Sequence, residues 1–371
     1  MFVGRAGVVS LIALAAIAAS ACSSSSKKAN PSTSSTTSAT AAPAASTATT
    51  TMPSPIPAGT ALLEYGDQKP DIWAVDAHGN RLQKLVTAFA GETVERAQLD
   101  RDGQSIWYLE QKFGQLCGDL VHLDLVTNKR DVVTQAYDFA LHGGRLAITR
   151  VPDGGNSTCE TGRATKAPLS IRDVVTGTEI NWSPDAALQE KQQAIERGAG
   201  GSVLFEMPQW SSDGKTLLLS SCQGACIVKL TPAPQMPSSA YSLVPLVPGT
   251  TFDSMSWSTA GLYLSTGDQL CCDGPAAGQT VTIQRYDPVT LGAPTIVYHA
   301  KDEYLLDQVV SMASTLYVTA RAYATGPGAS GAPGAKVHLT NTRRLFTLGS
   351  DGRLTRIGPT ALSRGAFSAA H

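Results

Sequence analysis

The sequence predicts an all-β fold, and more specifically a six-bladed β-propeller, from one repeated unit and its spacing. The clearest copy of this unit is residues 209–221, where a short strand, an Asp-Gly turn and an apolar strand follow one another. Related units recur at intervals of roughly 40 to 55 residues, which is the length of a four-stranded propeller blade. Charged residues make up only 16% of the chain, and Thr, Ser and Val are abundant, which also favours strands over helical bundles.

Five inner hairpins are expected, each made of two strands joined by a tight turn. They lie at residues 98–109, 138–148, 209–221, 256–264 and 310–318. The Asp-Gly turns in these hairpins predict type I′ geometry, which needs positive φ at both central residues. Gly143-Gly144 and Ser314-Thr315 replace Asp-Gly in two hairpins, so the register of the blades stays open.

Outer hairpins repeat as well. Three of them share an Asp-x-Val-Thr turn that begins at Asp124, Asp173 and Asp287, where the Asp side chain is expected to accept a backbone hydrogen bond from two residues on. The full blades are expected at 94–134, 135–182, 205–247, 252–299 and 305–359. Residues 60–90 supply three further strands, and a strand at 365–370 completes that mixed blade. Pairing of the N- and C-terminal strands would close the ring and remove exposed sheet edges.

These repeats resemble the TolB-type, WD-like propeller repeats of bacterial envelope proteins, most clearly at 210–221 and 99–109. The resemblance covers about residues 60–371 and implies a fold rather than an activity. The alternative architecture is a two-sheet sandwich. A sandwich explains the number of strands but not the recurrence of two different turn signatures.

The N-terminus is expected to be a lipoprotein signal peptide over residues 1–21. Arg5 precedes an apolar segment, residues 8–21, that is too short to span a bilayer comfortably. Ala19-Ser20-Ala21-Cys22 resembles the lipobox of bacterial lipoproteins, although that family usually has Leu where this chain has Ala19. The resemblance implies diacylation of Cys22 and anchoring to the extracytoplasmic face of the cell membrane. Ordinary secretory cleavage nearby is the alternative.

Residues 22–58 are rich in Ser, Thr, Ala and Pro and contain almost no large apolar side chains. A segment of this composition cannot bury a core, so we expect a disordered, lipid-anchored linker. It is similar to the tethers of actinobacterial lipoproteins. The propeller domain is then expected to occupy residues 59–371.

Six of the seven cysteines remain once Cys22 is set aside, and an even number in an exported chain predicts disulfides. They are Cys117, Cys159, Cys222, Cys226, Cys271 and Cys272. Each follows the second expected strand of a blade and precedes the third, so all six map to one face of a propeller. A helix expected at 186–197, after Ser183-Pro184-Asp185, and a long loop at 323–335 map to the same face.

The pairing of these cysteines has more than one solution. Cys117–Cys159 is favoured between adjacent blades. Cys222 and Cys226 either close a local loop, which leaves Cys271–Cys272 as a strained vicinal bridge, or pair across blades with Cys271 and Cys272. A metal site built from these last four cysteines is disfavoured by their spacing and by an oxidising compartment.

No catalytic motif is present: the chain lacks Gly-x-Ser-x-Gly, His-Glu-x-x-His and a phosphate-binding glycine loop. His122 is expected to be a strand residue that faces a neighbouring blade. Several acids lie near expected strand ends, where they either cap backbone groups or line a central channel and bind a cation. They are Asp119, Asp138, Asp253, Asp273 and Asp307.

The sequence therefore favours a monomeric, non-catalytic binding or scaffold module of the cell envelope. Long stapled loops on one face of a rigid scaffold are typical binding surfaces, here for a protein, a peptide or a glycan. A formal net charge of -1 gives no indication of a nucleic-acid partner, and no cofactor or metal is expected. One alternative is a propeller enzyme, a dehydrogenase, hydrolase or lyase, that uses the central channel. A structural subunit that docks a membrane complex is another.

Overall fold

The structure is a computed structural model, and everything below concerns the residues that it describes. These are Ile56 and residues 62–66, 71–87, 92–112, 115, 117–150, 169–195, 205–246, 251–267, 282–299, 304–312, 314–324, 338–363 and 365–369. The predictions for Cys22, Cys159, Cys271, Cys272 and Asp273 lie outside these residues, as do those for the signal peptide and the linker.

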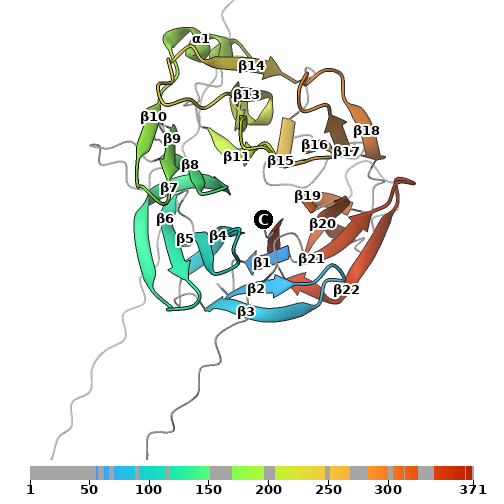
Figure 1. Cartoon of the computed structure of the whole chain (residues 1–371). Helices are drawn as coiled ribbons and strands as arrows, with labels where there is room; N and C mark the ends of the chain where they lie inside the picture. The colour runs from blue at the N-terminus through green and yellow to red at the C-terminus, as the bar shows by residue number, and fades with distance from the viewer. Residues whose placement is uncertain are drawn as a thin grey trace, which may run out of the picture. The chain divides into compact units, whose positions relative to one another are not determined.

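The described strands form five antiparallel sheets, which confirms the all-β expectation (Figure 1). The first sheet contains, in order, β23 (Gly365–Ala369), β1 (Leu62–Gly66), β2 (Asp71–Val75) and β3 (Arg81–Thr87). The second contains β4 (Glu92–Leu99), β5 (Ser105–Lys112), β6 (Gly118–Asp124), β7 (Arg130–His142), β8 (Arg145–Arg150), β9 (Leu169–Asp173) and β10 (Glu179–Trp182).

The remaining three sheets have four strands each. One contains β11 (Glu206–Trp210), β12 (Leu217–Ser221), β13 (Cys226–Leu230) and β14 (Tyr241–Pro245). The next contains β15 (Thr251–Ser258), β16 (Gly261–Gly267), β17 (Thr282–Tyr286) and β18 (Thr295–His299). The last contains β19 (Tyr304–Met312), β20 (Thr315–Ala324), β21 (His338–Leu348) and β22 (Leu354–Ser363).

The seven-stranded sheet consists of two four-stranded units that share one long strand. Residues 130–136 of β7 pair with β6, whereas residues 136–142 pair with β8. The register shifts between Ala136 and Asp138, so the strand is irregular where it passes from one unit to the other. With this division, every unit has four strands. The alternative of a two-sheet sandwich is wrong, because the described strands make five sheets.

The C-terminal strand β23 pairs with β1, with Leu62 opposite Ala369. This is the pairing of chain ends that the sequence predicts. The first strand of each four-stranded unit also contacts the first strand of the next. We call these strands the inner strands: they are β4, residues 136–142 of β7, β11, β15, β19 and β23, and their contacts run from β4 through this series and back to β4.

The geometry of the Asp-Gly turns differs from the prediction. Type I′ requires positive φ at both central residues, but only the glycine has it, with φ of 67° at Gly103 and 65° at Gly214. In both turns the glycine N–H bonds to the carbonyl three residues earlier. Such a turn is of type I followed by a left-handed glycine. The two-residue Gly143-Gly144 turn, which departs from the repeat, is the one with positive φ at both positions.

Side chains from one inner strand satisfy the backbone of the next. Arg96 donates to the carbonyl of Phe139, and the N–H of Leu141 donates to Gln98, so both bonds link residues 43 apart. Ser254 and Ser256 accept hydrogen bonds from the N–H groups of Val309 and Ser311, again at one constant separation, 55. A constant separation over successive residues means that neighbouring inner strands run in the same direction.

Apolar clusters fill the space between consecutive sheets. One cluster joins Trp107 and Leu120 with Phe139 and Ile148, and its members come from both units of the seven-stranded sheet. His122 lies opposite Trp107 in the register, and its ring is 4.5 Å from the indole. It is a strand residue, as expected. No helix among the described residues is both long and apolar enough to cross a bilayer.

Replacing Ser256 with Ala should destabilise the domain, because the buried N–H of Ser311 then loses its acceptor. The expected loss in the free energy of unfolding is about 1 to 3 kcal/mol. Ser265 is the matched control: it is buried on the adjacent strand, but its hydroxyl has no hydrogen-bond partner among the described residues. Ser265→Ala should be neutral or slightly stabilising. Denaturant unfolding of both variants tests this, and equal losses would contradict it.

Candidate binding end of the domain

The antiparallel order of the strands gives every unit two different ends. The inner hairpin turns and the turns between third and fourth strands lie at one end, which we call the turn end. The connections between second and third strands, and those between units, lie at the other, which we call the loop end. Because neighbouring inner strands run in the same direction, the loop ends of successive units lie side by side.

At the turn end, the three Asp-x-Val-Thr turns have one structure. In each, the Asp carboxylate accepts hydrogen bonds from the N–H groups two and three residues on, as at Asp124 with Val126 and Thr127. Asp173 and Asp287 make the same pair of bonds. These bonds lower the pKa of all three carboxyls. The role predicted for these aspartates is thus a local structural one.

The turn end also joins two neighbouring units through His142 and Arg145. The Arg145 guanidinium stacks 4.7 Å from the Trp210 ring and donates to the carbonyl of Gly214. A Cβ atom at Gly214 would lie 2.5 Å from Cδ2 of His142, so a larger residue would have to displace this ring, and the φ of 65° also favours glycine. Burial lowers the pKa of His142, and the positive charges of Arg145 and Arg101 add to the effect.

At the loop end, the helix α1 (Ala186–Ile195) begins where the sequence predicts, and Asp185 caps it. The Asp185 carboxylate accepts a hydrogen bond from the N–H of Leu188, which is the N-cap arrangement. The described helix ends at Ile195, and the expected end at Gly198 lies outside the described residues. Leu188 packs into an apolar cluster with side chains from the seven-stranded sheet and from the sheet of β11 to β14.

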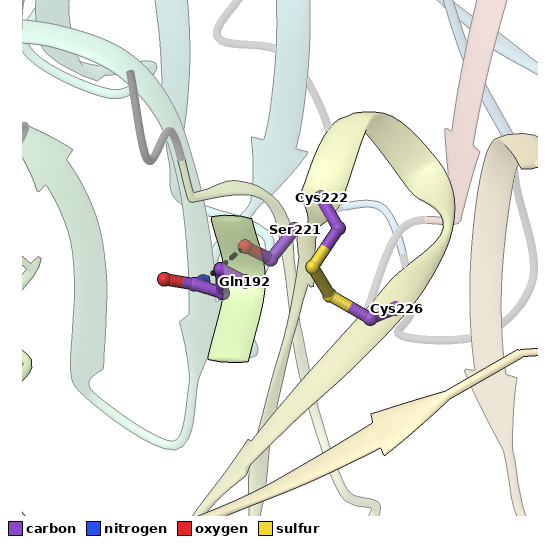
Figure 2. Close-up of a disulfide and its surroundings, with 4 residues drawn as sticks. All are labelled: Gln192, Ser221, Cys222 and Cys226. Atoms are coloured by element: carbon purple, nitrogen blue, oxygen red, sulfur yellow. Dashed lines mark hydrogen bonds between the residues drawn. A yellow bond between two sulfur atoms is a disulfide. The ribbon is translucent and has the colours of Figure 1, made fainter. Parts of the chain in front are cut away.

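The second half of α1 is bound to the β12–β13 turn. Gln192 is fully buried, and its side-chain amide donates to the hydroxyl of Ser221, the last residue of β12 (Figure 2). The short 3-10 helix η1 (Cys222–Gly224) follows directly, and Cys222 forms a disulfide with Cys226 across the turn (Figure 2). Of the pairings left open by the sequence, the local loop is therefore the one observed, and pairing of Cys222 or Cys226 across blades is wrong.

Cys117 is also disulfide-bonded and buried, just before β6. Its pairing with Cys159 stays a prediction, because Cys159 lies outside the described residues. The same holds for a bond between Cys271 and Cys272. The four-cysteine metal site loses two of its ligands to the Cys222–Cys226 disulfide, and the described residues contain no group of three or more potential metal ligands.

Every inner strand from β4 to β19 breaks register near the loop end. The shifts lie between Val94 and Arg96, Ala136 and Asp138, Glu206 and Gln209, Phe252 and Ser254, and Leu306 and Gln308. An irregularity of this kind redirects side chains and ends pairing. Three of the residues at these breaks are acidic, namely Glu95, Asp253 and Asp307. Asp253 and Asp307 are two of the acids predicted to lie near strand ends, and the structure places both on inner strands.

Asp138 is the central polar residue of this region. Its carboxylate lies 3.0 Å from Nε of Arg96 on β4 and accepts a hydrogen bond from the N–H of Met207 on β11. Met207 has a positive φ of 48°, a conformation that non-glycine residues adopt only under local constraint. Burial raises the pKa of Asp138, and Arg96 and the two N–H donors partly oppose this rise. One buried carboxylate thus binds three consecutive inner strands.

Glu206 lies beside this carboxylate. The side chain of Glu206 is exposed, but the surrounding protein atoms partly desolvate its carboxyl and raise its pKa, and repulsion from Asp138 raises it further. Asp119, by contrast, lies on β6, the third strand of its unit, and so does not border the inner strands. The sequence singled out Asp138 but did not indicate Arg96 or Glu206. Both residues lie within expected blades but before the expected inner hairpins at 98–109 and 209–221, and the register shifts beside them have no residue signature.

No known protein family matches the chain, and no curated protein matches it either. Solved structures do. The β-propeller domain of Cps50 (Swd1) from Myceliophteria thermophila is 10% identical, over 83% of this chain and 88% of that one, with a TM-score of 0.47. The periplasmic gluconolactonase PpgL from Pseudomonas aeruginosa is 13% identical, over 84% and 99%, with a TM-score of 0.44. An oligogalacturonate lyase in complex with manganese is 15% identical, over 77% and 70%, with a TM-score of 0.42. At these scores and identities, no activity is transferred to this chain.

Replacing His142 with Gln should flatten the dependence of stability on pH. The pKa of His142 is lower in the folded protein than the ordinary value of about 6.5, so the unfolded chain takes up the proton first as the pH falls. Stability is therefore complete above about pH 6.5 and declines below it. Denaturant unfolding at several pH values should show a smaller decline for His142→Gln. The control is His78→Gln, at an exposed turn, which should keep the native decline. The same decline in all three proteins would contradict the assignment.

Proposed function

We propose that residues 59–371 form a six-bladed β-propeller that acts as a non-catalytic binding or scaffold module of the cell envelope. A lipid on Cys22 would anchor it to the extracytoplasmic face of the membrane, and residues 22–58 would act as its tether. The partner is an envelope protein, a peptide or a glycan, bound at the loop end.

Six blades are supported by the division of the strands. Four sheets have four strands each, and the seven-stranded sheet divides at Ala136 into two units of four. Closure is supported by the pairing of β23 with β1 and by the contacts of β23 with both β19 and β4. When the two chain ends pair in one sheet, every inner strand has a neighbouring inner strand on each side. A propeller avoids open sheet edges in this way.

Binding at the loop end is supported by one observation above all: five successive inner strands break register at the same level. Acidic residues occupy three of these five breaks, and the exposed Glu95 and Glu206 lie beside Arg96 and Asp138, respectively, which form an ion pair. The disulfide turn and α1 belong to the same end. The turn end consists instead of short turns whose carboxylates are occupied by backbone N–H groups.

A propeller enzyme remains the second candidate, and Glu206 is the observation in its favour. A carboxyl with a raised pKa beside a second carboxyl is a recurrent arrangement for acid–base chemistry. A binding module is favoured, because Asp138 is already bonded to Arg96 and to two backbone N–H groups and so is not available to substrate.

Reversing charge at the loop end should abolish partner capture. The test is crosslinking and affinity capture from envelope membranes with the full chain carrying Glu95→Arg and Glu206→Arg. The matched control carries Lys129→Glu and Lys215→Glu, two exposed charges at the turn end. Loop-end binding predicts that the first variant loses at least about tenfold in recovered partner, equivalent to about 1.4 kcal/mol, while the control does not. Equal recovery by both variants, or loss only in the control, would place the partner elsewhere.

Replacing Cys22 with Ala should release the protein from membranes. Two acyl chains anchor a protein stably because each buried methylene contributes about 0.8 kcal/mol. Fractionation of cells that express the native or the Cys22→Ala chain measures the partition directly. A variant that still sediments with membranes would show that something other than a lipid on Cys22 provides the attachment.

A further inference from the structure

Two carboxyl groups from adjacent strands meet inside the seven-stranded sheet. Glu92 is the first residue of β4 and lies opposite Lys112, while Glu110 is two residues earlier on β5 and lies opposite Val94. The two glutamates therefore lie on one face of the sheet, at diagonal positions. Their carboxyl groups are within hydrogen-bonding reach of each other. Only 3% of the Glu110 side chain is exposed.

Two acceptor atoms of this carboxyl pair are buried without a hydrogen-bond partner. The Arg130 guanidinium donates to Oε2 of Glu110. Oε1 of Glu110 and Oε2 of Glu92 are both fully enclosed, and neither has a hydrogen-bond partner among the described residues. Two ionised carboxylates can only accept, so this contact has no donor unless one of the carboxyls carries a proton.

The surrounding charges do not neutralise a second carboxylate. On this face, β7 supplies Arg130, and β5 supplies Tyr108, whose hydroxyl bonds to the same guanidinium. On β6, Asp119 lies opposite Glu110 and adds a further acid, while Lys112 is exposed. From the neighbouring sheet, Leu63, Ile72, Ala74 and Val86 belong to the apolar cluster that also contains Val94 of β4 and Tyr108 of β5. Arg130 thus balances one carboxylate, and among the described residues no ion pair is found for the second carboxyl.

We propose that Glu92 and Glu110 share a single proton in the folded protein and thereby join β4 to β5 at the loop end. This contact between the two carboxyls, which we call the latch, forms at low pH and is broken at high pH. It lies between the inner strand that carries Glu95 and the strand that leads to disulfide-bonded Cys117. Loss of the proton would place two negative charges next to each other, one on the buried Glu110 and one on the half-buried Glu92.

The direction of the pH dependence follows from the burial of Glu110. Burial raises the pKa of this carboxyl, the Arg130 guanidinium opposes the rise, and the neighbouring Glu92 adds to it. The folded protein therefore binds a proton that the unfolded chain has already released. The contribution of the latch to stability is present at low pH and is lost as the pH rises through the raised pKa.

The test compares the melting temperature of the full chain and its Glu110→Gln variant from about pH 5 to about pH 9. Glutamine supplies a permanent N–H donor in place of the shared proton. The advantage of the variant over the native chain should therefore grow with pH, by about 2 °C or more across the range. Glu179→Gln is the matched control, because Glu179 pairs with Arg150 at 2.7 Å and the described residues place no second carboxyl in this ion pair. If both variants follow the native chain in parallel, the proposal is wrong.

Two further measurements keep the test decisive. Infrared spectra of the native chain at neutral pH should show a protonated carboxyl band that is missing from Glu92→Gln, so the question can be answered even when Glu110→Gln does not fold. Calcium chloride at alkaline pH should leave the melting temperature of the native chain unchanged. Stabilisation by calcium of the native chain but not of Glu92→Gln would show a bound cation in place of the proton and would overturn the proposal, as would absence of the infrared band.

Discussion

The unpaired edge of each inner strand is the constraint on which the rest of this structure depends. An inner strand pairs with its own sheet along one edge only, and its other edge carries N–H and C=O groups that cannot remain buried without partners. Side chains of the neighbouring unit supply these partners: Gln98 bonds to Leu141, Ser256 to Ser311, and the Trp210 indole donates to the carbonyl of Ala140. The units are therefore joined by hydrogen bonds of fixed register, in addition to the apolar clusters between them. These bonds fix the position of each inner strand along its neighbour.

Because the inner strands are fixed relative to one another along their direction, their register shifts lie at the same distance from the loop end. A bulge relieves a strand of its ladder pairing, and the freed backbone needs another partner. The carboxylate of Asp138 serves Met207 in this way while it pairs with Arg96, so a charge that is costly to bury is bonded on several sides. The polar character of the loop end is thus a consequence of how the sheets are held together. The exposed acids Glu95 and Glu206 extend that polar region to the solvent.

The sequence predicts the strands of this protein much better than the bonds between its units. Strand pairs follow from alternating apolar residues and Asp-Gly or Asp-x-Val-Thr turns, which are local signals. The turn type was wrong at Asp102-Gly103, because Asp-Gly also suits a longer turn in which only the glycine is left-handed. Gln98 and Ser256 look like ordinary polar strand residues, since their partners lie 43 and 55 positions away. The Cys222–Cys226 bond was one of two open solutions, and the register of β12 against β13 decides between them by placing Ser221 opposite Cys226.

The pairing of β1 with β23 has a consequence for the order of events during synthesis. These strands come from opposite ends of the described chain, so the contact between them has a very long loop to close and forms late. Until β23 has been synthesised, β1 has a free edge and β4 lacks the neighbour that β23 provides. Nascent chains would expose two adjacent strand edges during that period, and a chain that ends before Gly365 would keep them exposed.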